Sequence, residues 1–277
     1  MRNLILYSVL FSFCFLGGIV RSQEGQDSNA PTSSVFGNSQ QSEAAMMGIL
    51  YDLKQTQDRK STNVDPNTYT DVLDEYFLKN WDESVLERYY RVSKPLFTTQ
   101  VFVPNMDADN APKAFGAEKT VQPSRWVIHY KAQVSAPVDG TYRFWGCADD
   151  VMAVAVNDKT ELICERPDMR FTKTQWKASE PDGAQGADDS LRPGDWFTVK
   201  ADDIIDLDIV IGERPGGYFN AFVMIEKQGE GYEKDAKGHN ILPIFQVAPY
   251  DTPALNDVNK EPKFCKATPS SIWKSYQ

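Results

Sequence analysis

The sequence predicts a mainly β protein, an antiparallel β-sandwich or barrel that carries an N-terminal helical appendage. The first indication is a stretch of three strand-like runs between Trp126 and Cys164, separated by short turn-forming segments. In the first run apolar side chains alternate with polar ones, which marks a strand buried on one face. The other two runs are rich in aromatic and β-branched residues, as strands prefer. Further runs of this kind lie at 206–212 and 218–226.

The chain begins with a candidate signal peptide at residues 1–22. Arg2 is followed by an apolar run from Leu4 to Val20, and Val20 and Ser22 are small enough for the positions before a cleavage site. A membrane anchor is the alternative, although the run is marginal in length for a span. We therefore expect an exported protein, secreted or in the cell envelope, with no stable membrane span.

The charge of the exported chain argues against two classes of partner. Removing Arg2 and Arg21 leaves 27 basic against 39 acidic residues, a net charge of −12. Such a surface repels nucleic acid and anionic lipid. The length suits one large β-domain with appendages.

The segments before the β-domain are predicted to be a flexible leader at 23–41 and a helical region at 42–95. Ser42 is a candidate N-cap for a helix whose apolar residues recur at helical spacing, either as core packing or as a partner-binding face. These residues are Met46, Ile49, Leu50 and Leu53. A second helix is expected from Thr70, and a short third one at 84–87, where the spacing is that of a capping box.

The β-domain is predicted to span 96–248, and an irregular tail follows at 249–277. A first strand is expected at 96–103, and strand pattern resumes at 196–200 after a long connection at 166–195. The runs at 206–212 and 218–226 are joined by Arg214-Pro215-Gly216-Gly217, a turn sequence.

Three cysteines remain after signal-peptide removal. If Asp158-Lys159 is the hairpin tip, Cys164 comes opposite Ala153 and near Cys147, so a Cys147–Cys164 disulfide is predicted, with Cys265 as the rival partner of either. No Cys-x-x-Cys motif supports a metal site. His129 falls on the polar face of its strand and is expected at the surface.

These residues also carry a family resemblance. The segment DGTYRFWGCADDVMAVAVND at 139–158 resembles the PA14 family, the β-domain first described in anthrax protective antigen. The segment DIVIGERPGGYFNAFVMIEKQG at 208–229 resembles the closing hairpin of that family. The likeness covers roughly residues 96–229 and implies a PA14-like β-sandwich.

The resemblance implies a calcium site at Asp149 and Asp150. In sugar-binding members, two consecutive aspartates joined by a cis peptide hold Ca²⁺, which binds the vicinal hydroxyls of a sugar; oxygen ligands are what Ca²⁺ prefers. This chain lacks the family's asparagine in the comparable turn, so Glu213 or Asn220 is the candidate further ligand. Arg214 is the alternative, because its charge can neutralise the aspartates without a metal.

The predicted function is that of a non-catalytic module that binds a glycan or cell-surface polysaccharide, with Ca²⁺ as the candidate cofactor. Trp176 in the long connection is a candidate aromatic platform, or else a ring packed on the domain surface. The alternative function is a structural or assembly module that binds an envelope protein partner. A hydrolase is a distant third, because adjacent carboxylates cannot be assigned the two facing roles of a glycosidase.

Overall fold

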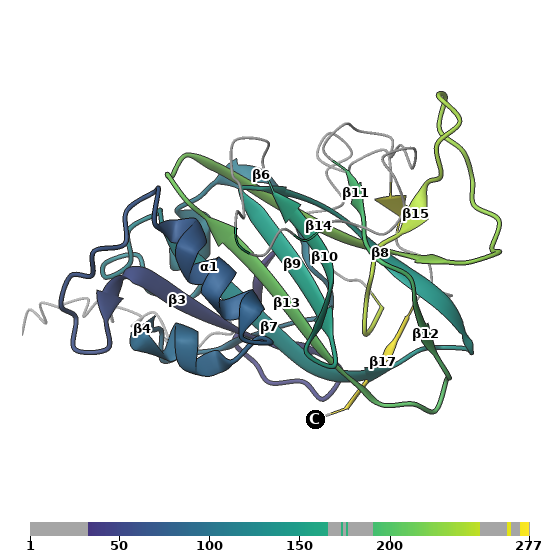
Figure 1. Ribbon diagram of the computed structural model, residues 1–277, viewed down its shortest axis with the longest axis horizontal. Coiled ribbons are helices and arrows are strands. Elements are labelled where there is room, and N and C mark those ends of the chain that lie inside the picture. The colour runs from purple at the N-terminus through teal and green to yellow at the C-terminus, as the bar shows by residue number, and fades with distance from the viewer. Residues whose placement is uncertain are drawn as a thin grey trace, which may run out of the picture. The chain divides into compact units, whose positions relative to one another are not determined.

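Two antiparallel β-sheets, packed face to face, make up most of the computed structural model (Figure 1). The structure describes residues 33–165, 173, 176, 191–249, 265–266 and 272–276. From Pro31 onward the chain is one compact unit. The mainly β architecture and the two antiparallel sheets confirm the predicted fold class. The predicted signal peptide at 1–22 and all but Lys173 and Trp176 of the connection at 166–190 lie outside the described residues.

Sheet I has the strand order β1-β2-β5-β3-β7-β13-β9-β10, with β4 beside β3 and β17 beside β7. Its strands are β1 (Ser33–Ser34), β2 (Gly37–Asn38), β3 (Met46–Thr56), β4 (Tyr89–Arg91), β5 (Leu96–Thr98), β7 (Trp126–Ser135), β9 (Val151–Val156), β10 (Lys159–Glu165), β13 (Ile205–Glu213) and β17 (Lys274–Tyr276).

Sheet II has the order β11-β8-β14-β6, with β12 beside β8. Its strands are β6 (Phe102–Asp107), β8 (Gly140–Asp149), β11 (Arg192–Pro193), β12 (Phe197–Val199) and β14 (Tyr218–Lys227). A short parallel pair, β15 (Leu242–Pro243) and β16 (Cys265–Lys266), forms a third, two-stranded sheet.

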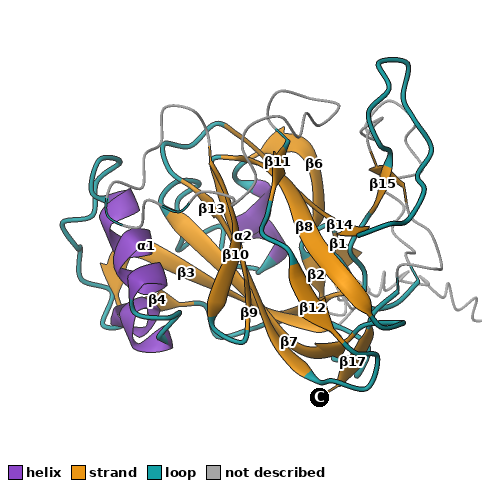
Figure 2. Cartoon of the chain, turned by 45° about the vertical axis from the view of Figure 1, so that its right-hand side comes forward, coloured by secondary structure: helices purple, strands orange, loops and turns teal. Residues whose placement is uncertain are grey.

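Helix α1 (Tyr69–Leu78) and the 3₁₀ helix η1 (Glu83–Arg88) cover the outer face of sheet I, and α2 (Asn110–Ala114) is a short turn of helix after β6 (Figures 1 and 2). The helices expected from Thr70 and near 84–87 are therefore confirmed. The cap of η1 is Asp82, whose side chain accepts a hydrogen bond from the Ser84 N–H at 3.0 Å. Among the described helices, none has both the length and the apolar character needed to cross a membrane.

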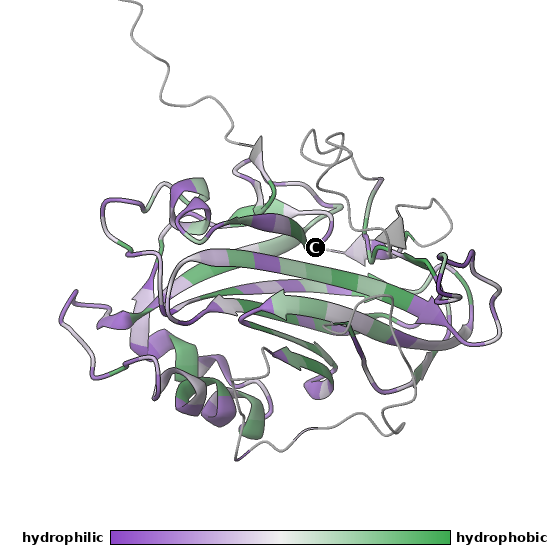
Figure 3. Cartoon of the chain, turned by 90° about the horizontal axis from the view of Figure 1, so that it is seen from above, coloured by the Kyte–Doolittle hydropathy of each residue, from purple (hydrophilic) through white to green (hydrophobic). Residues whose placement is uncertain are grey.

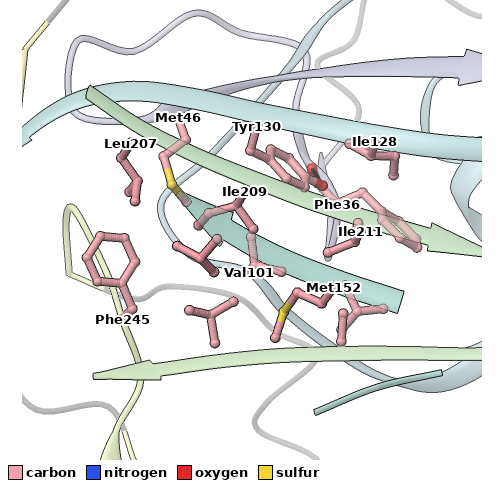
Figure 4. Close-up of a cluster of buried hydrophobic side chains, with 14 of the residues drawn as sticks. Phe36, Met46, Val101, Ile128, Tyr130, Met152, Leu207, Ile209, Ile211 and Phe245 are labelled. Carbon is pink, nitrogen blue, oxygen red and sulfur yellow. Dashed lines mark hydrogen bonds between the residues drawn. The ribbon is translucent and has the colours of Figure 1, made fainter. Parts of the chain in front are cut away.

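The space between the sheets is filled by one apolar cluster, here called the core cluster (Figure 4). Alternate residues of β13, such as Leu207, Ile209 and Ile211, point into it and are almost fully buried. Alternation along the strands is visible in the hydropathy colouring of Figure 3. Burial of each such side chain contributes roughly 1.5–3 kcal/mol to the free energy of folding. The core cluster is therefore a main source of stability for these strands.

A helix was expected around Met46–Leu53, and this prediction is wrong, because these residues form strand β3. Met46 and Leu50 point into the core cluster, whereas Ile49 and Leu53 point into a second apolar cluster beneath α1 and η1, here called the outer cluster. With both faces of the strand buried, the polar alternation of an ordinary strand is missing. Apolar residues on both faces then imitate helical spacing.

His129 was expected at the surface, and this is also wrong, because only 1% of it is exposed. The helical segments cover the face of β7 that carries it. Its Nε2 lies 2.6 Å from Asp208 Oδ1 and 3.3 Å from the Tyr76 hydroxyl, which comes from α1. The face that looked polar in sequence is thus a buried hydrogen-bond network.

The ends of the described chain are more ordered than predicted. Within the leader expected at 23–41, β1 and β2 join sheet I, and the buried Phe36 packs on Phe219. Within the tail expected to be irregular, β17 pairs with β7, and Trp273 is fully buried in the core cluster. These aromatic rings fill the core, which holds both end segments on the sheets.

Two strand predictions need smaller corrections. The strand expected at 96–103 is divided into β5, in sheet I, and the start of β6, in sheet II. The expected closing hairpin is not one, since β13 pairs with β7 and β9 while β14 pairs with β6 and β8. The turn at 214–217 therefore carries the chain from one sheet to the other. The strand expected at 196–200 is confirmed as β12.

Candidate functional site

Two sheet-to-sheet crossings lie side by side at one end of the sandwich. The chain leaves β8 of sheet II at Asp149 and enters β9 of sheet I after Asp150, while β13 of sheet I ends at Glu213 and leads into β14 of sheet II. The Asp150 N–H donates to the Gly212 carbonyl at 3.3 Å, which ties the first crossing to the second. Asn220 is the ladder partner of Asp149. The strand registers therefore gather these side chains from separate parts of the sequence.

The peptide bond between Asp149 and Asp150 is cis, as the family resemblance implies. Asp150 is fully buried, whereas Asp149 is half-buried. The Asp150 Oδ2 accepts a hydrogen bond from the Arg214 N–H at 2.7 Å. The backbone of the second crossing thus orients the buried carboxylate.

Glu213 stands at the start of the second crossing and is 1% exposed. Its Oε1 accepts a hydrogen bond from the Gly216 N–H at 2.6 Å, which fixes the turn. Gly216 and Gly217 have φ values of +97° and +118°, a conformation that other residues rarely adopt. Glu213 Oε2 is buried and has no hydrogen-bond partner among the described residues.

The carboxylates at this end perturb one another. Burial raises the pKa of Asp150 to about 6, and the neighbouring Asp149 adds to the rise, while the Arg214 N–H and guanidinium oppose it. Burial also raises the pKa of Glu213 to about 8, with the charges of Asp150 and Asp149 adding to the rise. At neutral pH the cluster therefore favours a proton, or another cation, among its oxygens.

The structure brings together all the residues predicted for the calcium site. Asp149, Asp150 and Glu213 form the acidic cluster, and Asn220 lies across the ladder from Asp149. The Asn220 Oδ1 accepts a long hydrogen bond of 3.8 Å from the Cys147 thiol. Arg214, also predicted at the site, is half-buried, and its charge lowers the pKa of Asp150.

Oxygen atoms of this kind suit Ca²⁺, which accepts carboxylate, amide and carbonyl ligands. The buried Glu213 Oε2 accepts no hydrogen bond from a donor group among the described residues, and the Glu213 carboxyl instead interacts with Asp150, so a proton or a cation between the two acids would be stabilising. Among the described residues, no three His, Cys, Asp or Glu side chains are already arranged as a metal-binding group. A bound ion would thus have to draw on Asn220 or backbone oxygens in addition to the acids.

Trp176, the candidate platform, is half-buried and packs against both the core cluster and the outer cluster. These apolar contacts agree with the packing role that the sequence left open.

The predicted Cys147–Cys164 disulfide is wrong, because both residues are buried thiols. Cys164 points into the core cluster, but Cys147 points to the opposite face of sheet II, where it packs with Trp145 and Phe222. The hairpin tip is Asn157-Asp158 rather than Asp158-Lys159, and together with the bulge between Thr160 and Leu162 this places Cys164 opposite Met152 rather than Ala153. Burial raises the pKa of the Cys164 thiol well above its usual range. No side-chain description exists for Cys265.

Sequence analysis did not predict that helix α1 reaches this site. Tyr69 is in the first turn of α1, and its hydroxyl donates a hydrogen bond to the Trp126 carbonyl at 3.1 Å. A Cβ added to Gly212 would lie only 2.0 Å from this hydroxyl. Burial raises the pKa of Tyr69, and the charges of Asp150 and Glu213 add to the rise. The only available signal was the glycine itself, at the end of an otherwise bulky strand.

No protein-family model and no curated protein matches the chain. Among solved structures, it matches the PA14 sugar-binding domain of an RTX adhesin at 19% identity, covering 68% of this chain and 93% of that one, with a TM-score of 0.40. The PA14 domain of the antifreeze protein MpAFP matches at 13% identity over 69% and 87% of the two chains, with a TM-score of 0.39. The A domain of epithelial adhesin 6 from Candida glabrata, solved with Galβ1-3GlcNAc, matches at 10% identity over 76% and 95%, with a TM-score of 0.42. The chain is thus similar in fold to PA14 domains, the family that its sequence resembles, and its ligand has to be inferred from its own residues.

Proposed function

We propose that this protein is an exported, non-catalytic module that binds glycans through a Ca²⁺ ion held at Asp149 and Asp150. The main support is the acidic cluster, in which a fully buried Asp150 and a nearly buried Glu213 both have raised pKa values beside a half-buried Asp149. A divalent cation would let all of these groups ionise. Asn220, half-buried and opposite Asp149, is the candidate amide ligand.

Each side chain has a distinct part in this proposal. Asp150 and Glu213 supply buried negative charge, and the Arg214 and Gly216 N–H groups hold their carboxylates in place. Asp149 and Asn220 are partly exposed, so the solvent side of the site is where a sugar would approach. When bound, Ca²⁺ supplies coordination positions for vicinal hydroxyl groups of the sugar.

Calorimetric titration with Ca²⁺ tests the metal site. We expect a dissociation constant between micromolar and millimolar for the wild type and loss of binding in Asp149→Asn. Asp158→Asn, which changes an exposed acid at the tip of the β9–β10 hairpin, is the matched control and should bind normally. No heat in the wild type would refute the calcium site.

Proton release gives a second, independent readout. Because the pKa values of Asp150 and Glu213 are raised to about 6 and about 8, Ca²⁺ must displace protons at pH 7. The measured heat should therefore differ between buffers of different ionisation enthalpy. A glycan array read in calcium and in EDTA then tests the sugar, and equal signals in both would remove the ion from the mechanism.

The alternative is a structural or assembly module that binds an envelope protein. It is favoured by Arg214, whose N–H and charge already stabilise Asp150 without any metal. Under this alternative, calcium gives no heat and the protein co-purifies with a partner from the native envelope.

A further inference from the structure

A second candidate site lies at the opposite end of the sandwich, and it does not depend on the proposed glycan function. A cavity of about 780 Å³ is bounded by the β9–β10 hairpin, β12 and the loop that leads into β13. It includes Val156, the last residue of β9, and Ile205, the first of β13. Since Asp150 precedes β9 and Glu213 ends β13, the cavity and the acidic cluster occupy opposite strand ends.

The cavity lining includes a buried carboxylate that could accept a further hydrogen bond. Glu161 lies in the bulge between Thr160 and Leu162 of β10, lines the cavity and is 2% exposed. Its Oε1 accepts a hydrogen bond from Lys159 Nζ at 2.9 Å. Its Oε2 is buried and has no hydrogen-bond partner among the described residues. A buried oxygen of this kind costs free energy unless a donor reaches it.

Other lining residues define what kind of donor fits. The exposed Asp202 and Asp203 add negative charge, against the single positive charge of Lys159. The apolar part of the wall is made by Phe197, Val199 and Ile204. Ile204 is 53% exposed, which is unusual for such a side chain. The lining therefore combines net negative charge with an apolar wall.

We propose that this cavity binds a primary alkylammonium group, with its N–H groups donating to Glu161 Oε2 and its alkyl chain lying against Phe197 and Ile204. An ammonium group carries three donors and a positive charge, which match a buried carboxylate and two nearby acids. A strongly hydrated metal ion would gain nothing from the apolar wall. Burial raises the pKa of Glu161, so a cation that restores its charge is favoured.

The test uses n-butylammonium and the neutral isostere 1-butanol, titrated into the protein in EDTA and followed by NMR. We expect saturable binding of butylammonium and none of 1-butanol. Glu161→Gln keeps the shape and should weaken binding about tenfold or more. Lys159→Met removes a competing ammonium group and should strengthen it, so a folding defect cannot explain both results. Glu118→Gln, at an exposed residue outside the cavity lining, is the matched control.

Two results would overturn the proposal: equal binding of 1-butanol and butylammonium, or unchanged binding in Glu161→Gln. Comparison with Nα-acetyl-lysine methylamide identifies the source of the amine. Tighter binding than butylammonium assigns the cavity to a lysine side chain of a protein, and weaker binding assigns it to a free amine. Asp150→Asn should leave all of these values unchanged, which separates this site from the calcium site.

Discussion

Replacing Glu213 by glutamine should make the calcium-free protein more stable at alkaline pH. Glu213 is buried next to Asp150, and burial with the charges of Asp150 and Asp149 raises its pKa from 4.5 to about 8. The folded state thus binds a proton at this carboxyl more tightly than the unfolded chain does. The stability that this proton provides is present below pH 4.5 and is lost as the pH rises towards 8.

The size of the effect follows from the pKa change. One pKa unit corresponds to 1.36 kcal/mol, so a rise from 4.5 to about 8 corresponds to roughly 5 kcal/mol between the two ends of this pH range. Glutamine keeps an oxygen for the Gly216 N–H and carries no charge. Burying its amide costs about 1–3 kcal/mol, so a net gain of about 2–4 kcal/mol in unfolding free energy is expected at pH 9.

Urea unfolding at pH 5.5 and pH 9, in EDTA, measures this difference. The gap between Glu213→Gln and wild type should widen with pH, whereas Glu118→Gln, at an exposed position, should follow the wild type at both. Ca²⁺ should narrow the gap at pH 9 if the cluster holds the ion. A variant that is no more stable than wild type at pH 9 would refute the electrostatic account of the cluster.

Three further predictions concern the parts that support the site. Gly212→Ala places a Cβ 2.0 Å from the Tyr69 hydroxyl and should cost about 1–3 kcal/mol; Tyr69→Phe in the same chain should recover part of this loss in chemical unfolding. His129→Ala leaves the buried Asp208 without its partner at 2.6 Å and should cost about 3–5 kcal/mol, and a loss below 1 kcal/mol would show that the pair is solvated. Asp82→Ala removes the N-cap of η1, so the Ser84 N–H loses its side-chain acceptor and the urea midpoint of unfolding should fall below that of the wild type.

Local pattern was sufficient for the central strands and for the Asp149–Asp150 crossing. The three runs from Trp126 to Val156 became β7, β8 and β9, and the residues after the next turn form β10. Turn-forming residues located the β9–β10 hairpin to within one residue, since the tip was expected at Asp158-Lys159 and lies at Asn157-Asp158, which both have positive φ. These features depend on neighbours in sequence, so they can be read from sequence.

What depended on tertiary burial was not predictable. Recognising a strand by its alternation of apolar and polar residues assumes that one face of the strand is exposed to solvent. In sheet I the helical segments cover the outer face, so both faces are buried. Because both faces of β3 are buried, its sequence was mistaken for that of a helix. The same helical segments bury His129, which was expected at the surface. The disulfide prediction failed for a related reason, since Cys164 of sheet I points into the core cluster whereas Cys147 of sheet II points away from it.

The same burial changes how the N-terminal region should be understood. From the sequence this region was predicted to be an appendage, because its residues lie outside the family resemblance. In the structure, β3 pairs with β7 at the middle of sheet I. Tyr69 of α1 lies beside Gly212, next to the acidic cluster. The buried Tyr69 ring and hydroxyl occupy space beside Gly212 that solvent would otherwise fill. Burial is the largest cause of the raised pKa values of Asp150 and Glu213, and Tyr69 lies close enough to them for their charges to raise its own pKa. The helical segments are therefore expected to contribute to the cation affinity that we propose for this site.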